Sequence, residues 1–172
     1  MTRNRLGIFV ILALLLSVTV LVGAAAGDPG AEQRRPLNIS LEFIGTPGDF
    51  ECPDGFLPQA FVGGGHLSHL GRVEISGGAC NDFVNLVLAN GFGTYVGANG
   101  DSIDVEYSGQ ASFIPPDTFT GEGSGTIVRG TGRTASASGE FEFTSETSVS
   151  GGQTSLSGRG WIAYDASDRR NK

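Results

Sequence analysis

A stretch punctuated by glycine, residues 119–143, constrains the fold of this chain more than any other feature. It ends in Glu-Phe-Glu-Phe (residues 140–143), and this period-two alternation predicts a β-strand with one apolar face. Upstream, Gly121, Gly123 and Gly125 are spaced by two, so they share one face of a strand. A row of glycines lets a strand bend sharply and lets bulky neighbours lie against bare backbone. The stretch therefore predicts two strands of a small, closed barrel.

The rest of the chain also has the pattern of short β-strands. About nine candidates with no amphipathic helix predict an all-β fold, a single antiparallel up-and-down β-barrel of about eight strands over residues 37–165. The candidates are residues 37–43, 56–62, 67–76, 83–89, 92–98, 102–109, 118–128, 140–147 and 154–164. Residues 83–89 could instead form a short buried turn of helix.

The pair Asn99-Gly100 is the strongest hairpin signal in the chain. A two-residue turn there would pair Val96 with Ile103 and Thr94 with Val105 across the two strands. In that register every apolar residue of the second strand meets a partner on the same face, which is why we expect it.

The N-terminus predicts export. Arg3 and Arg5 precede an uncharged apolar run, residues 6–22, and three alanines then stand before Gly27. This pattern is typical of a helical signal peptide, residues 1–26, cleaved near Ala26. An uncleaved membrane anchor is the alternative, because a span needs about 20 apolar residues. We expect a secreted or extracytoplasmic protein with a flexible lead-in (residues 27–36) and a polar tail (residues 166–172).

Cys52 and Cys80 are the only cysteines. Export to an oxidising compartment favours a disulfide between them. Closing a loop of that size would stabilise the fold by about 3–4 kcal/mol in the chain-entropy treatment. A redox or metal-binding thiol pair is the alternative, and it lacks both a Cys-x-x-Cys spacing and a cluster of further ligands.

The charge of the chain indicates which partners to expect. The formal net charge is −7, with 18 acidic residues against 11 Lys and Arg. No basic stripe runs along any predicted strand, so we expect no nucleic-acid partner. No later segment is apolar enough to span a membrane, so no membrane contact is expected after signal cleavage. Asn38 lies in an Asn-Ile-Ser sequon, which predicts glycosylation only in a host that glycosylates exported proteins.

Residues 130–133 (Gly-Thr-Gly-Arg) and 137–139 (Ala-Ser-Gly) resemble a turn of the allene oxide cyclase and dirigent group, which also has uncharacterised exported bacterial members. Thr134 and Ser136 depart from that turn, where the group usually has phenylalanine and glycine. The resemblance implies a small antiparallel barrel with a lumen, often trimeric in the plant members. It carries over no catalytic or ligand residue, because none matches position by position, and a shared fold does not transfer chemistry.

The two histidines, His66 and His69, do not indicate a metal site or a catalytic base. Three residues apart on one strand, they would point to opposite faces, and no third ligand is evident. His69 shares its predicted face with Leu67, Val73 and Ile75, so we expect it to point into the barrel. We predict no catalytic residues, no metal and no cofactor.

Four residues, His69, Tyr107, Phe119 and Tyr164, are the candidate ligand-binding residues, because the alternation points them towards a common interior. Aromatic walls with a few polar tips are typical of small-molecule cavities, and also of filled cores. We expect the filled core rather than the cavity, because large apolar side chains are usually buried.

The leading functional hypothesis is non-enzymatic binding of a small apolar or aromatic molecule in the barrel. One alternative is a structural or interaction protein, a homo-oligomer with a filled barrel. The other is an isomerase or cyclase-like enzyme that acts by confining a reactive substrate.

Overall fold

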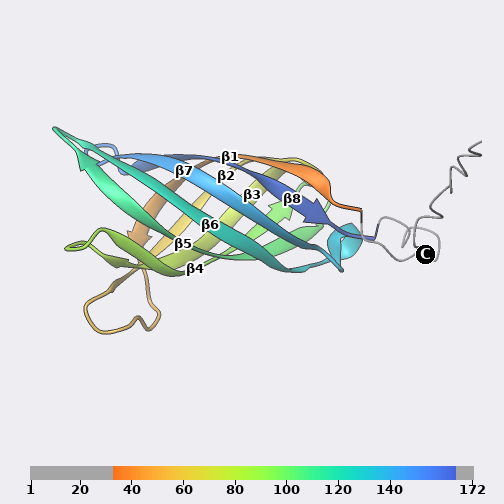
Figure 1. Cartoon of the computed structure of the whole chain (residues 1–172), viewed down its shortest axis with the longest axis horizontal. Helices are drawn as coiled ribbons and strands as arrows, with labels where there is room; N and C mark the ends of the chain where they lie inside the picture. The colour runs from red at the N-terminus through yellow and green to blue at the C-terminus, as the bar shows by residue number, and fades with distance from the viewer. Residues whose placement is uncertain (1–32, 166–172) are drawn as a thin grey trace, which may run out of the picture. The chain divides into compact units, whose positions relative to one another are not determined.

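The computed structural model describes residues 33–165, which form a closed barrel of eight antiparallel strands (Figure 1). Each strand pairs with the next along the chain, and the last pairs with the first. The strands are β1 (Arg35–Pro47), β2 (Leu57–Leu67), β3 (Gly71–Asp82), β4 (Val87–Gly97), β5 (Ser102–Ile114), β6 (Thr118–Gly130), β7 (Ser138–Ser148) and β8 (Gln153–Ala163). A single 3-10 turn, η1 (Gly132–Thr134), lies between β6 and β7. The predicted all-β, up-and-down barrel is confirmed.

The predicted signal peptide (residues 1–26), most of the lead-in and the tail lie outside the described residues. β1 begins at Arg35, two residues before the expected start of the barrel domain. Within residues 33–165 no helix is long and apolar enough to cross a membrane.

Two of the strand candidates, residues 83–89 and 92–98, belong largely to one strand. The chain turns at residues 83–86 and then continues as β4. The pairing of β4 with β5 shifts between Leu88 and Gly91, and Asn90 has a φ of 50°. An irregularity of this kind interrupts the period-two alternation, so one strand has the sequence pattern of two.

The predicted hairpin register between β4 and β5 is wrong by one residue. Ile103 pairs with Tyr95 rather than with Val96. The loop is longer than two residues, because the Gly97 N–H donates to the Asp101 carbonyl at 2.8 Å. Burial explains the register, since Tyr95 is 5% exposed and Val96 is 40% exposed. A one-residue slip would exchange these two side chains between the core and the solvent.

The predicted strand over residues 67–76 is interrupted by a tight turn at residues 68–70. Leu67 and Gly71 pair directly across this turn, with φ values of 75° at His69 and 76° at Gly71. Glycine adopts that conformation without steric cost. His69 therefore lies in the turn and does not share the inner face of Val73.

Glycines of β6 make room for aromatic rings in the interior, as the sequence predicts. A Cβ placed on Gly123 would lie 2.6 Å from Cζ of Phe143, and one on Gly125 would come closer still to the Phe141 ring. Atoms cannot approach that closely, so only bare backbone allows these rings to pack where they do.

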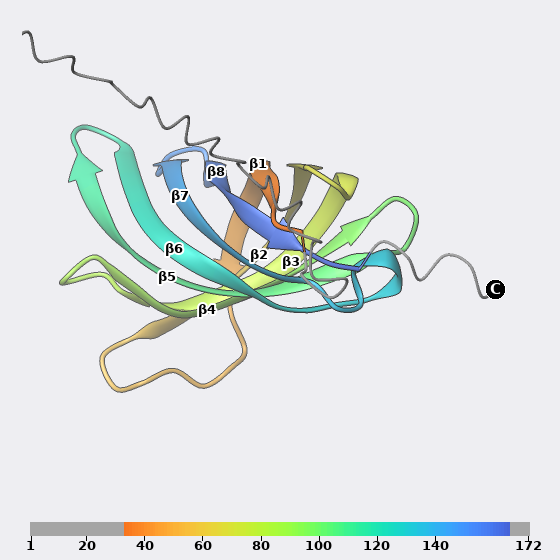
Figure 2. The ribbon, with the colours of Figure 1, turned by 45° about the vertical axis from the view of Figure 1, so that its right-hand side comes forward.

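The two ends of the barrel differ. The end that holds the turn at residues 68–70, the loop at residues 98–101 and η1 is here called the closed end (Figure 2). Its interior is filled with buried apolar side chains. Those that are at most 1% exposed include Leu37, Leu67, Ile103 and Ile162. The opposite end, here called the open end, holds the loops at residues 48–56, 83–86, 115–117 and 149–152. The expected filled core is present at the closed end only.

The predicted disulfide is confirmed. Cys52 and Cys80 are bonded with an S–S distance of 2.00 Å. The bond ties the long loop between β1 and β2, visible below the barrel in Figure 2, to β3. In the same loop Phe50 packs edge-on against Phe92 of β4, with ring centroids 5.3 Å apart. A disulfide is compatible with an extracellular location.

Candidate functional site

A cavity of about 290 Å³ occupies the open end of the barrel. Side chains from all eight strands line it, because the inner positions alternate with outer ones along each strand. Its main apolar lining residues are Leu41, Phe43, Phe61, Ile75, Phe143 and Leu156. None of the residues that line it is Asp, Glu, Lys, Arg or His. The cavity is therefore apolar and uncharged.

Aromatic rings form a connected wall around this cavity. The centroid of the Phe61 ring lies 5.1 Å from that of Phe43 and 6.5 Å from that of Tyr107. Tyr107 in turn packs edge-on against Phe143 at 5.9 Å, and Phe143 contacts Phe141 at 6.4 Å. Rings at these separations attract one another beyond simple burial, so each holds its neighbour in place. The wall is preformed rather than assembled around a guest.

Two of the four predicted site residues, Tyr107 and Phe119, line this cavity. The Tyr107 hydroxyl donates a hydrogen bond to the Gly78 carbonyl at 3.2 Å. Burial, together with the nearby Tyr95 hydroxyl, raises the pKa of Tyr107, so the side chain stays neutral. Phe119 lies nearer the mouth, where its ring packs against Phe113 with centroids 4.9 Å apart.

The mouth of the cavity combines apolar side chains with hydroxyl groups. Phe83 and Val149, from two of the open-end loops, line it while remaining 56% and 53% exposed. Thr147 and Thr154 also line it, and their hydroxyls hydrogen-bond each other at 2.9 Å. An apolar molecule can therefore reach the interior without passing a charged group of the lining.

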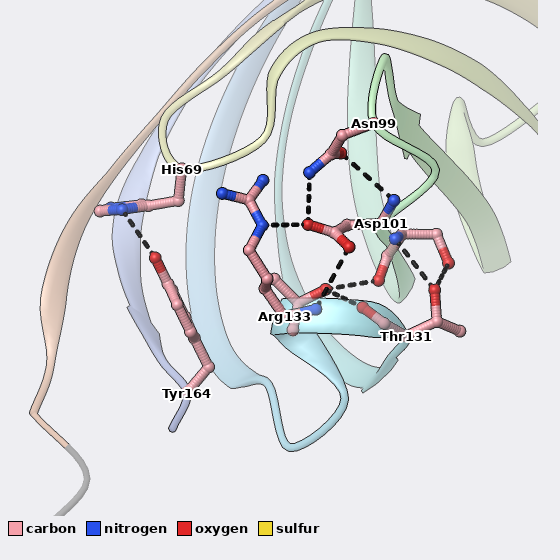
Figure 3. Close-up of polar contacts among 8 residues, drawn as sticks. His69, Asn99, Asp101, Thr131, Arg133 and Tyr164 are labelled. Atoms are coloured by element: carbon pink, nitrogen blue, oxygen red, sulfur yellow. Dashed lines mark hydrogen bonds and ion pairs between the residues drawn. The ribbon is translucent and has the colours of Figure 1, made fainter. Parts of the chain in front are cut away.

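The other two predicted site residues, His69 and Tyr164, lie together at the closed end, away from the cavity (Figure 3). The His69 Nε2 donates to the Pro36 carbonyl at 2.9 Å, and its Nδ1 lies 3.3 Å from the Tyr164 hydroxyl. The guanidinium carbon of Arg35 lies 4.5 Å from the centre of the Tyr164 ring. His69 does not line the cavity, because it lies in the turn between β2 and β3 and not on the inner face of a strand. The pair ties β1, this turn and the end of β8 together.

A second polar network at the closed end surrounds Asp101, which is 8% exposed (Figure 3). Its carboxylate accepts hydrogen bonds from Arg133, through both Nε and the backbone N–H, and from the Asn99 amide. Burial disfavours the charged form, but these hydrogen bonds outweigh it and lower the pKa of Asp101. Gly132, with a φ of 59°, leaves no space for a side chain beside this carboxylate. The Gly-Thr-Gly-Arg turn (residues 130–133) thus packs against the loop at residues 98–101 at the closed end of the barrel.

The sequence analysis missed Tyr95, which lines the deep part of the cavity. The predicted register turned it outward, because that register placed Thr94 on the inner face. A signal was present in the glycine spacing, since Gly91, Gly93 and Gly97 alternate with Tyr95 in the way that the glycines of β6 do. A row of inner-face glycines predicts that the large residue in the row is also inward.

Within residues 33–165, no group of three or more His, Cys, Asp or Glu side chains is arranged to hold a metal ion. Comparisons of the chain with protein-family models, with curated proteins and with solved structures find no match. The resemblance to the allene oxide cyclase and dirigent group remains a prediction.

Proposed function

We propose that this protein binds a small, uncharged, apolar or aromatic molecule in the cavity at the open end of its barrel. The observation that carries this proposal is the aromatic-walled space of about 290 Å³. Small-molecule sites span roughly 300–1,000 Å³, and an apolar cavity of about 150 Å³ is enough to hold benzene. A guest of one or two rings, or a short branched hydrocarbon chain, matches this size.

The absence of charge in the lining supports an uncharged guest. An ionised group moved into this space would lose its hydration and gain no opposite charge, which costs several kcal/mol or more. Apolar surface moved into it gains roughly 25 cal/mol for each Å² removed from water. The cavity should therefore take up neutral molecules and reject their ionised analogues.

Binding is favoured over the isomerase or cyclase-like alternative. General acid–base catalysis needs a titratable group within hydrogen-bond reach of the substrate. The lining offers only hydroxyl and amide groups, and burial raises the pKa of its two tyrosines away from neutrality. The disulfide supports a site of action outside the cytoplasm.

A thermal-unfolding assay with a filled-cavity variant tests the proposal. Ser145 lines the cavity, and the bare backbone of Gly121 lies opposite it, so Ser145→Phe would fill the space with a ring. The neighbouring Thr144 faces outward, which makes Thr144→Phe the matched control. Ethylbenzene and naphthalene serve as neutral probes, and benzoate as the ionised one.

We expect the neutral probes to raise the melting temperature of the wild type and of Thr144→Phe, but not of Ser145→Phe. A free concentration of 100 times Kd stabilises by about 2.7 kcal/mol, or roughly 5–10 °C for a chain of this size. Benzoate should cause no shift. The proposal is wrong if no neutral probe raises the melting temperature, or if Ser145→Phe responds as the wild type does.

A further inference from the structure

Tyr95 lies deep in the cavity, on the inner face of β4. The residue is 5% exposed, and it lines the cavity. Its ring leans along the strand, with Cε1 lying 3.2 Å from the position a Cβ on Gly93 would take. Gly93 is nearer the open end than Tyr95 is, because β4 runs from the open end to the closed end. The ring therefore extends towards the hollow part of the barrel.

The Tyr95 hydroxyl has no hydrogen-bond partner among residues 33–165, whereas the Tyr107 hydroxyl is bonded to the Gly78 carbonyl. In the same part of the chain, every fully enclosed side-chain nitrogen or oxygen has a partner. The Tyr95 oxygen is thus not fully enclosed, and in a residue so deeply buried it can only border the cavity. Buried hydroxyls in proteins are normally hydrogen-bonded, so an unused one facing a cavity indicates a place for a partner.

The hydroxyl acts as a donor at neutral pH. Burial raises the pKa of Tyr95 above its ordinary value, so the proton stays on the oxygen. No cation lines the cavity that could stabilise a phenolate. The free hydroxyl is therefore a fixed hydrogen-bond donor in an otherwise apolar pocket.

We infer that Tyr95 selects guests that carry a neutral oxygen acceptor, such as the carbonyl of an aryl ketone or ester, and hydrogen-bonds that oxygen deep in the cavity. This inference rests on the proposed binding function and names the ligand class. A carbonyl accepts this hydrogen bond without bringing a donor of its own. A carboxylate would accept it too, but would remain a buried anion without a counter-charge.

The position of Tyr95 also sets the orientation of the guest. The acceptor end enters first, and the apolar body lies against the wall formed by Phe61 and Phe143. The hydroxyls of Thr147 and Thr154 hydrogen-bond each other, which uses one of their two protons, so the donor left over lies at the mouth and not in the deep part of the cavity. A guest that lacks an acceptor leaves the Tyr95 hydroxyl unpaired and binds more weakly.

The test compares acetophenone with ethylbenzene, two molecules of nearly equal shape that differ by a carbonyl in place of a methylene. Titration calorimetry on the folded protein gives both affinities for the wild type, for Tyr95→Phe and for the control Tyr164→Phe, whose hydroxyl lies beside His69 at the closed end and does not line the cavity. We expect Tyr95→Phe to weaken acetophenone by roughly 5- to 100-fold and to leave ethylbenzene unchanged. Tyr164→Phe should keep the preference for acetophenone.

Infrared spectroscopy supplies a readout that a purely structural role would not move. The carbonyl stretch of bound acetophenone should shift to lower frequency in the wild type and return towards its value in hydrocarbon solvent in Tyr95→Phe. An equal acetophenone-to-ethylbenzene ratio in the wild type and in Tyr95→Phe overturns the inference while leaving the proposed binding function intact. If neither molecule binds the wild type, the proposed function fails and this inference fails with it.

Discussion

Replacing Gly123 by alanine tests whether bare backbone in β6 is required for this barrel. The added methyl would meet Cζ of Phe143 at 2.6 Å, Cα of Gly109 at 2.8 Å and, closest of all, the backbone carbonyl of Ser108 on β5. Real Cβ atoms essentially never show contacts below 3.0 Å, so something must move. A ring can rotate, but the carbonyl belongs to the paired neighbouring strand and cannot yield without disturbing the sheet.

Gly121 provides the matched control on the same face of the same strand. A Cβ there would meet the rotatable Ser145 hydroxyl at 2.6 Å, and its nearest backbone atom, the Gln110 carbonyl, is 3.8 Å away. Replacing a strand glycine by alanine gains about 0.5–1 kcal/mol of conformational entropy. Overpacking costs about 1–3 kcal/mol or more. We therefore expect Gly123→Ala to lose about 2 kcal/mol of unfolding free energy, and Gly121→Ala to stay within about 0.5 kcal/mol of the wild type or to gain slightly.

Urea unfolding followed by Trp161 fluorescence measures both variants. A loss of about 2 kcal/mol corresponds to a fall of roughly 4–8 °C in melting temperature for a chain of this size. Because Phe143 also belongs to the cavity wall, Gly123→Ala should weaken guest binding as well. If the two alanine variants had the same unfolding free energy, the close backbone contact at Gly123 would not be what destabilises Gly123→Ala, and the argument would be refuted.

Two further changes have defined outcomes. Replacing Cys52 and Cys80 together by serine should lower the unfolding free energy by about 3–4 kcal/mol, read as a lower urea midpoint, and a midpoint equal to that of the wild type would contradict the stabilising role of the bond. Asp101→Asn should cost about 1–2 kcal/mol, because the neutral amide cannot pair with the Arg133 guanidinium, which is 37% exposed and stays partly hydrated. The pKa of Asp101 is lowered by folding, so its contribution is complete above its unfolded value of 3.8 and is lost as the pH falls through the folded value. Urea midpoints measured from pH 2 to 7 should fall more steeply in acid for the wild type than for Asp101→Asn, and parallel curves would exclude this contribution.

The sequence predicted the barrel because the signals for it are local. Period-two alternation, glycine rows and turn residues are all readable within a few positions, and each agreed with closure of the sheet. The disulfide followed from having only two cysteines, Cys52 and Cys80, in a chain whose N-terminal sequence predicts export. The same reasoning placed Tyr107 and Phe119 inward, and they are.

The incorrect predictions concern strand register and turns, where a shift of one residue is decided by contacts across the whole barrel. A turn of two residues at Asn99-Gly100 was the local preference, and it put Thr94 rather than Tyr95 inside. The buried Asp101 lengthens that loop through contacts with Arg133, about 30 residues further on, which no local pattern contains. His69 looked like a strand residue because its neighbours alternate, whereas a positive φ places it in a turn. Which aromatic rings line the cavity depends on the pairing register of all eight strands, and local sequence patterns do not give that register.

The start of β1 and the end of β8 lie side by side, with Arg35 paired to Ile162 at the closed end. A linker joined directly before β1 or directly after β8 therefore leaves the barrel at the closed end. Immobilised on a sensor chip through such a linker, the protein would keep its mouth free for analyte, so weak guests could be screened without redesigning the attachment.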